Sequence, residues 1–244
     1  MANDSLRPKV TCLMECSIDG RLDESRWSKM FDPNGEGDPD VYYETRAKID
    51  ADAALLGRVT VQKHYAKNIF KTENHTVASQ LTPFRGIRTN QKMLAVFDST
   101  GMLAYESNEI SGSTVVTVLG SKLVSEEYLD FLRSKEISYT FAGDDGRDLN
   151  AALHSLYNDF GLKHVLLAGG GLLNGSFLKA GLIDELDVVV YPGLDGLNGV
   201  NSIFEFKGEK NEKPCQGQTL ELLDVAKCRA GVVLLRYAFH RTEE

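Results

Sequence analysis

The chain has few cysteines and a shortage of positive charge. Four cysteines in 244 residues are too few and too scattered for a disulfide framework, so a hydrophobic core must hold the fold together. Cys12 and Cys16 would share one face of a strand, and we expect them to pack in the core, since no Cys-x-x-Cys spacing or histidine partner completes a metal site. The 27 basic against 35 acidic residues give a net charge of −8, which argues against a nucleic-acid surface.

Long apolar runs are also missing. No run approaches the roughly 18 residues of a membrane span, and the opening stretch MANDSLRPKV lacks the apolar core of a signal peptide. We therefore expect no membrane contact and a cytoplasmic location. The five histidines are dispersed, without the i, i+4 pair of a zinc helix, and the His-x-Glu and Cys-x-x-Cys motifs of zinc deaminases do not occur. No metal site is predicted.

The remaining composition is that of an ordinary globular protein. With 42% hydrophobic and 25% charged residues, a chain of this length can bury a sizeable core. It has no internal repeat and no linker long enough to mark a boundary. Residues 1–244 are therefore predicted to form a single domain.

Apolar runs alternate with segments of helical period along the chain. A first strand is predicted from about Lys9 to Ser17, before the turn signal Asp19-Gly20. The polar stretch DPNGEGDPD is unlike regular structure, and Asp38-Pro39 near its end suits the start of a helix through about Ile49. Further strands are predicted at 53–56, 92–98, 113–120, 136–143 and 164–171, and further helices from about Thr60, at Ser125–Arg133 with Ser125 as its cap, and at Leu149–Phe160 before Gly161.

The chain closes with TLELLDVAKCRAGVVLLRYAFHR, two apolar runs split at Arg229 to Gly231. This pattern predicts an antiparallel hairpin at a sheet edge. The order of the elements predicts an α/β fold, with one mostly parallel sheet flanked by helices. Ligands of such sheets bind beyond the carboxyl ends of strands, which directs attention to Gly57 and to Gly169–Gly171.

The stretch LLAGGGLLNGSFLKAGLIDELDVVVYPGLDG, from Leu166 to Gly196, indicates strand, glycine turn, short helix, strand and a second glycine turn. Three glycines allow positive φ and let a ligand touch the backbone, and a helix from about Leu173 to Lys179 would direct its N-terminal dipole at a bound anion. A tight turn without a ligand explains the same pattern. Gly169, Gly171 and Gly175 are one residue off the dinucleotide fingerprint G-x-G-x-x-G.

Four segments in order resemble the reductase domain of riboflavin-biosynthesis proteins, which belongs to the dihydrofolate-reductase-like superfamily. They are RPKVTCLMECSIDGRL, DAALLGRVTVQ, MLAVFDSTGML and, most specifically, the stretch from Leu166 to Gly196. The resemblance runs from about Arg7 to Tyr237. It implies a dihydrofolate-reductase-like fold, a homodimer, and NADPH as the cofactor for reducing the ribosylamino group of a pyrimidine phosphate to ribitylamino.

The resemblance also implies cofactor contacts at both glycine junctions. Gly57 and Thr60 would serve at the first, and Gly169, Gly170, Gly171 and Leu172 at the second, where backbone N–H groups and the Thr60 hydroxyl would face the pyrophosphate. Ser99 and Thr100 match the position that binds the 2′-phosphate. Ser121 and Lys122 are a second possibility, and each of these residues is otherwise a solvated loop residue.

For the substrate, the resemblance implies that Ser25 and Trp27 line the pocket, although a lone Trp can also be a core anchor. Asp19 ends the first strand and is a candidate catalytic residue that accepts a hydrogen bond or supplies a proton. Its alternative role is to form the turn before Gly20. Asp184 and Glu185 are expected to be structural.

Two departures from the family pattern leave the substrate open. Ala168 stands where the riboflavin reductases usually carry a substrate-contacting glutamate, and VQKHYAKNIFKT replaces their phosphate-gripping segment. Lys63 is the nearest basic candidate for the phosphate, followed by His64, Lys67 and Lys71, which can equally form a solvated helix face. A reductase with another heterocyclic or carbonyl substrate, or a non-catalytic nucleotide-binding relative, therefore stays an alternative.

Overall fold

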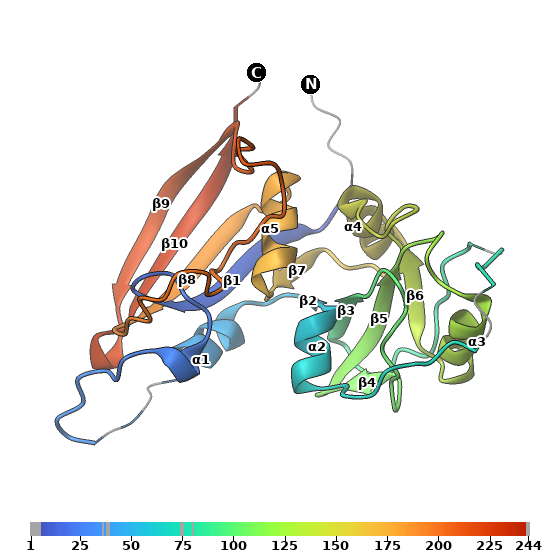
Figure 1. The fold of residues 1–244 in the computed structure, drawn as a ribbon, viewed down its shortest axis with the longest axis horizontal. Coiled ribbons are helices and arrows are strands. Elements are labelled where there is room, and N and C mark those ends of the chain that lie inside the picture. The colour runs from blue at the N-terminus through green and yellow to red at the C-terminus, as the bar shows by residue number, and fades with distance from the viewer. Residues whose placement is uncertain (1–5, 36, 38–39, 74–75, 80, 243–244) are drawn as a thin grey trace. The chain divides into compact units, whose positions relative to one another are not determined.

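The structure is a computed structural model that describes residues 6–35, 37, 40–73, 76–79 and 81–242 (Figure 1). The chain divides into two compact units, each built from separate segments. Unit 1 comprises Met1–Lys9 and Ala51–Val165, and unit 2 comprises Val10–Asp50 and Leu166–Glu244. The organisation of residues 1–244 as a single domain stays a prediction.

Unit 1 is built on parallel strands that follow short apolar runs. β2 pairs in parallel with β3, β3 with β5 and β5 with β6, while the two-residue β4 is antiparallel to β5. In this register Gly57 lies opposite Phe97, and Phe97 opposite Val118, so the carboxyl ends of β2, β3 and β5 are level. The strands are β2 (Ala53–Gly57), β3 (Met93–Phe97), β4 (Glu109–Ile110), β5 (Ser113–Leu119) and β6 (Ser138–Phe141).

Three helices of unit 1 pack on these strands: α2 (Arg58–His64), α3 (Glu126–Ser134) and α4 (Leu149–Asn158). α2 packs against β2 and β3, and α3 and α4 pack against β6. The predicted cap of α3 is confirmed, because the Ser125 side chain accepts from the backbone N–H of Tyr128. α4 ends two residues before Phe160, and Gly161 then takes the predicted left-handed conformation at φ 70°.

Unit 2 contains β1 (Lys9–Ser17, entering from unit 1), β8 (Glu185–Tyr191), β9 (Gln218–Lys227) and β10 (Val233–Arg241). β1 pairs in parallel with β8, β8 pairs antiparallel with β10, and β10 pairs antiparallel with β9. The predicted terminal hairpin is confirmed, and a one-turn 3-10 helix at Arg229–Gly231 makes its turn. β7 (His164–Leu167) spans the boundary between the units.

Helices α1 (Val41–Lys48) and α5 (Gly171–Lys179) and a 3-10 turn, η1 (Glu24–Arg26), also belong to unit 2. The predicted start of α1 at Asp38-Pro39 lies outside the described residues. Asp40 caps α1 in a left-handed conformation, φ 50°. η1 and β4 were not predicted, because segments of two or three residues carry no periodicity that sequence patterns can reveal.

The fold class predicted from the sequence is confirmed: the strands pair mostly in parallel, helices alternate with them, and an antiparallel hairpin closes the chain. Cys12 and Cys16 are buried in β1, which confirms their packing role. Burial raises the pKa of the Cys16 thiol to about 11, so it is not a reactive thiolate. No helix within the described ranges combines the length and apolarity needed to cross a bilayer.

Candidate functional site

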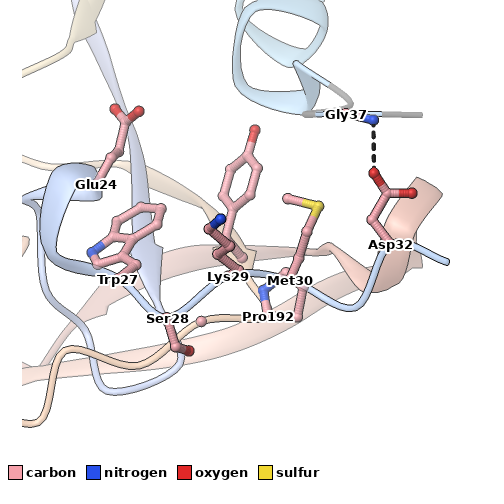
Figure 2. Close-up of a pocket in the computed structure, with 10 residues that line it drawn as sticks. Glu24, Trp27, Ser28, Lys29, Met30, Asp32, Gly37 and Pro192 are labelled. Carbon is pink, nitrogen blue, oxygen red and sulfur yellow. Dashed lines mark hydrogen bonds between the residues drawn. The ribbon is translucent and has the colours of Figure 1, made fainter. Parts of the chain in front are cut away.

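A cavity of about 390 Å³ lies in unit 2 (Figure 2). Its walls come from the segment around Trp27 and from the chain at the end of β8, Tyr191 to Gly193. The rings of Trp27 and Tyr191 are 5.8 Å apart between centroids and tilted by 35°. Met30 and Pro192 add apolar surface. Such a cavity suits a flat, partly apolar ligand.

Hydrogen bonds hold the Trp27 segment against the chain after β8. The Ser28 backbone N–H donates to the Leu194 carbonyl at 2.8 Å, and the Leu194 N–H donates to Ser28 Oγ at 3.0 Å. Arg26 makes a two-pronged ion pair with Asp195, with Nε 2.6 Å from Oδ2 and Nη2 3.0 Å from Oδ1. A cavity wall tied down in this way keeps its shape before a ligand arrives.

Asp19, the predicted catalytic residue, is engaged with the same loop. Its carboxylate accepts from the Ser17 hydroxyl at 2.6 Å, from the Gly196 N–H at 2.8 Å and from the Asp195 N–H at 3.2 Å. These donors, the Ser17 hydroxyl first, lower the pKa of Asp19 to about 2. An ionised carboxylate has no proton to give at neutral pH, so of the two roles predicted for Asp19 these contacts fit the hydrogen-bond acceptor and turn former.

We expect Asp19→Asn to lower the thermal stability of the protein near neutral pH, because an amide presents a donor to backbone N–H groups. The pKa of Asp19 falls from 3.8 to about 2 on folding. The stabilisation is therefore complete above pH 3.8 and is lost as the pH falls through 2. Unfolding temperatures measured from pH 2 to pH 7 should show the two proteins converging at the acid end. A difference that does not change with pH would contradict this assignment.

The glycines in and after the turn that follows β7 have a packing role, whether or not a ligand binds there. Gly169 has the positive φ expected of such a turn, at 106°, but Gly170 does not, at −52°. A Cβ on Gly171 would lie 2.5 Å from the Ser202 carbonyl oxygen, and one on Gly175 would lie 2.0 Å from that of Glu205. The chain at 202–206 thus explains two of the glycines without a ligand. The N–H groups of Gly171 and Leu172 open α5, where a helix has no intrahelical acceptors for them.

Gly175→Ala tests this close approach. At a helix position without close neighbours, replacing Gly by Ala raises the free energy of unfolding by about 1 kcal/mol. Here the added methyl group meets the Glu205 carbonyl, and we expect a loss of about 1–3 kcal/mol in the free energy of unfolding. Denaturant titration measures it, with Ser176→Ala on the same helix as the control, expected to change little. Equal or higher stability of Gly175→Ala would refute the packing explanation.

The predicted cofactor residues of unit 1 lie at the level ends of its parallel strands. Gly57 ends β2 and is the N-cap of α2, which carries Thr60, while Ser99 and Thr100 form the turn after β3. Thr100 is exposed and Ser99 is half-buried. Gly57 and these two residues therefore come together at one edge of the sheet of unit 1.

The alternative pair, Ser121 and Lys122, is already occupied. Lys122 Nζ lies 2.7 Å from Asp144 Oδ2, and the Ser121 hydroxyl donates to Asp144 Oδ1 at 3.3 Å. A phosphate placed there would meet the Asp144 carboxylate. That Ser99 and Thr100 bind a 2′-phosphate stays a prediction.

Arg58 and Asp98 form a pair at the same strand ends that sequence reasoning did not single out. The buried Asp98 carboxylate accepts from the N–H groups of Met102 and Leu103 at 2.7 and 2.9 Å, and its other oxygen lies 4.0 Å from Arg58 Nε. Burial raises the pKa of Asp98 against the effect of these donors. The Arg58 guanidinium is partly exposed and supplies a cation beside Gly57. The sequence signal that could have identified Arg58 was its position directly after Gly57.

The predicted substrate residues differ in their placement. Trp27 lines the cavity, whereas the Ser25 hydroxyl donates to Asp23 Oδ1 at 2.6 Å and is outside the cavity lining. Lys63 is exposed on α2 in unit 1. His64 lines a separate cavity of about 300 Å³ in unit 1, which Glu106 and Glu109 also line, so that cavity is a poor phosphate site. The roles of Ser25 and Lys63 stay predictions.

The chain is an α/β protein with a cavity of small-molecule size in unit 2. The chain belongs to the RibD C-terminal domain family, whose sequence model matches residues 8–234. This membership confirms the predicted resemblance. The chain is 23% identical over 211 residues to the 2,5-diamino-6-ribosylamino-4(3H)-pyrimidinone 5′-phosphate reductase of Aquifex aeolicus, with 85% of this chain and 87% of that relative covered.

Two solved structures share the fold. A pyrimidine reductase-like protein from Corynebacterium diphtheriae superposes with a TM-score of 0.67 at 16% identity, covering 96% of this chain and 92% of that one. The riboflavin biosynthesis reductase Rib7 of Saccharomyces cerevisiae superposes with a TM-score of 0.60 at 14% identity, covering 98% of this chain and 93% of that one.

Proposed function

We propose that this protein is an NADPH-dependent oxidoreductase that reduces the ribosylamino group of a phosphorylated pyrimidine to a ribitylamino group. The observation that carries the proposal is the cavity walled by Trp27 and Tyr191 in a member of this family. A pyrimidine ring is flat and partly apolar, as this cavity requires. The name of the Aquifex relative, a pyrimidinone phosphate reductase, supports the same substrate class.

The residues at the strand ends of unit 1 fit a nicotinamide dinucleotide. Arg58 offers a cation, Ser99 and Thr100 offer hydroxyl groups, and Gly57 leaves the backbone open at the start of α2. In unit 2, Gly169 to Leu172 present backbone N–H groups at the start of α5. When bound, the cofactor supplies the hydride that reduces C1′ of the opened sugar.

The residues of the cavity bind and orient the substrate. Trp27 offers a ring face for stacking, and the ion pair of Arg26 with Asp195 fixes the turn that carries it. Asp19 acts indirectly, because its carboxylate accepts hydrogen bonds from the N–H groups of Asp195 and Gly196. The required proton then comes from another group or from water, since Asp19 is ionised.

Turnover tests the function directly. The purified protein should oxidise NADPH, followed by the cofactor's absorbance, only when the phosphorylated ribosylamino-pyrimidine is present, and mass spectrometry should find the ribitylamino product. Oxidation with a different heterocycle or carbonyl compound instead would favour another substrate. Binding of NADPH without turnover of any such compound would favour a non-catalytic nucleotide-binding protein.

We propose that the protein forms a homodimer in which a second copy of the chain covers the terminal hairpin. Among the described strands β9 pairs with β10 alone, and it exposes four apolar side chains at fractions of 45–54%: Leu220, Leu222, Leu223 and Val225. An exposed apolar edge strand is a ready surface for a second copy. Light scattering should give twice the chain mass, and Leu222→Lys should lower it. A monomeric wild-type protein would contradict the proposal.

A further inference from the structure

Asp98 follows β3 and is 1% exposed, and its two carboxylate oxygens have different surroundings. Oδ2 accepts from the N–H groups of Met102 and Leu103, at 2.7 and 2.9 Å. Oδ1 is buried as well, but it accepts no hydrogen bond from any residue that the structure describes. A buried carboxylate oxygen without a donor destabilises the folded chain, so such an oxygen calls for an explanation.

Arg58 is the cation that Oδ1 faces. Its Nε lies 4.0 Å from Oδ1, which is about 1 Å beyond a hydrogen bond. Its Nη1 donates to Gln62 Oε1 at 2.7 Å, one turn further along α2. A guanidinium group carries five N–H donors. Gln62 and Asp98 can therefore orient Arg58 and still leave donors for an anion.

The Asp98 carboxylate also organises the turn that follows β3. It accepts from two N–H groups of this turn, and the Gly101 N–H donates to the Asp98 carbonyl at 3.0 Å. Gly101 has φ 68°, and a Cβ there would overlap the Tyr128 ring. The turn carries the half-buried Ser99 and the exposed Thr100. One buried carboxylate thus contacts both this turn and the start of α2.

We propose that Asp98 is a positioning residue for NADPH, because its Oδ1 holds Arg58 beside the turn of Ser99 and Thr100, where cation and hydroxyl groups bind the 2′-phosphate together. This inference rests on the proposed function. Asp98 is buried and acts through Arg58, whose side chain is 30% exposed. Its own negative charge would repel a phosphate. Positioning and repulsion therefore predict opposite effects when that charge is removed.

Asp98→Asn separates the contact with Arg58 from the contact with the turn. The amide keeps one oxygen to accept from the turn, but it directs an NH2 group, which can only donate, toward Arg58. We expect the Kd of NADPH to rise about tenfold, within the range for coupled neighbours. The Kd of NADH, which lacks the 2′-phosphate, should change by less than about twofold. Isothermal titration calorimetry measures both constants.

Asp159→Asn is the matched control. Asp159 follows α4 and pairs with Arg85 at 3.0 Å, so this variant also breaks an ion pair between an aspartate and an arginine of unit 1. It should leave the Kd values of NADPH and NADH unchanged. Asp98→Ser is a second variant that removes the carboxylate from Arg58, and it should shift the ratio of the two Kd values in the same direction as Asp98→Asn.

A double-mutant cycle tests whether Asp98 acts through Arg58. Arg58→Met alone should weaken NADPH binding by about 10- to 100-fold. Adding Asp98→Asn to Arg58→Met should weaken it by less than about twofold more, because no guanidinium group is left to position. Effects that simply multiply would overturn the proposal, since Asp98 would then act independently of Arg58.

The remaining outcomes keep this proposal apart from the proposed function. A wild-type protein that binds neither cofactor would overturn the cofactor site, and the role of Asp98 with it. Wild-type binding of NADPH together with unchanged or tighter binding in Asp98→Asn would overturn the role of Asp98 alone. Equal weakening of NADPH and NADH in Asp98→Asn would also overturn it, because a general disturbance of the fold does not distinguish the two cofactors.

Discussion

Replacing Trp27 by Leu should lower kcat/KM for the pyrimidine substrate by about 10- to 100-fold, the range that follows from the 1–3 kcal/mol by which an aromatic side chain stabilises a stacked base. Trp27 lines the cavity, and Leu keeps an apolar contact there but removes the flat ring face. Trp27→Phe retains a smaller face and should lose less. Steady-state kinetics with the phosphorylated substrate measure the effect, which should fall mainly on KM.

Phe31 provides a matched control for this substitution. It lies four residues from Trp27, is 87% exposed and does not line the cavity, so Phe31→Leu should leave kcat/KM unchanged. Trp27 also packs against Tyr191, and the unfolding temperature of each variant must therefore be recorded. If Trp27→Leu were folded and fully active, the cavity would not be the substrate site.

NADPH should raise the free energy of unfolding by about 2.7 kcal/mol when present at a hundredfold excess over its Kd, because it binds the folded chain alone. NADH, without the 2′-phosphate, should stabilise less at the same concentration. Arg58→Met should weaken NADPH binding by about 10- to 100-fold, since it removes a charge-assisted contact to a cofactor phosphate worth about 1.5–3 kcal/mol. Thermal unfolding with NADPH, with NADH and with neither measures all three.

Lys122→Met is the control for the loss of a positive charge in unit 1. Lys122 pairs with Asp144, so its removal should leave the NADPH shift as it is. An NADPH shift lost in Lys122→Met but kept in Arg58→Met would move the phosphate site to the loop after β5. A wild-type protein that neither cofactor stabilises would remove the cofactor site altogether.

Local sequence patterns determined most of the secondary structure. The boundaries of β1, the Ser125 cap of α3 and the turn of the terminal hairpin depend on residues close together in the chain, and the sequence alone predicted each of them. The motifs around Gly57 and after Leu166 also identified the family, because such motifs consist of residues close together in the chain. Trp27 as a cavity residue followed from the same resemblance.

Only the tertiary structure decided what the polar and glycine residues do, because their partners are distant in sequence. Asp19 accepts a hydrogen bond from the N–H group of Asp195, which is 176 residues away. The sequence alone could not reveal this contact, and so could not weigh it against the predicted catalytic role. Gly175 is explained by the close approach of the Glu205 carbonyl, and Lys122 pairs with Asp144, which is 22 residues away. Glu24 and Lys29 line one cavity with Tyr191 only because folding brings two segments that are far apart in the sequence together.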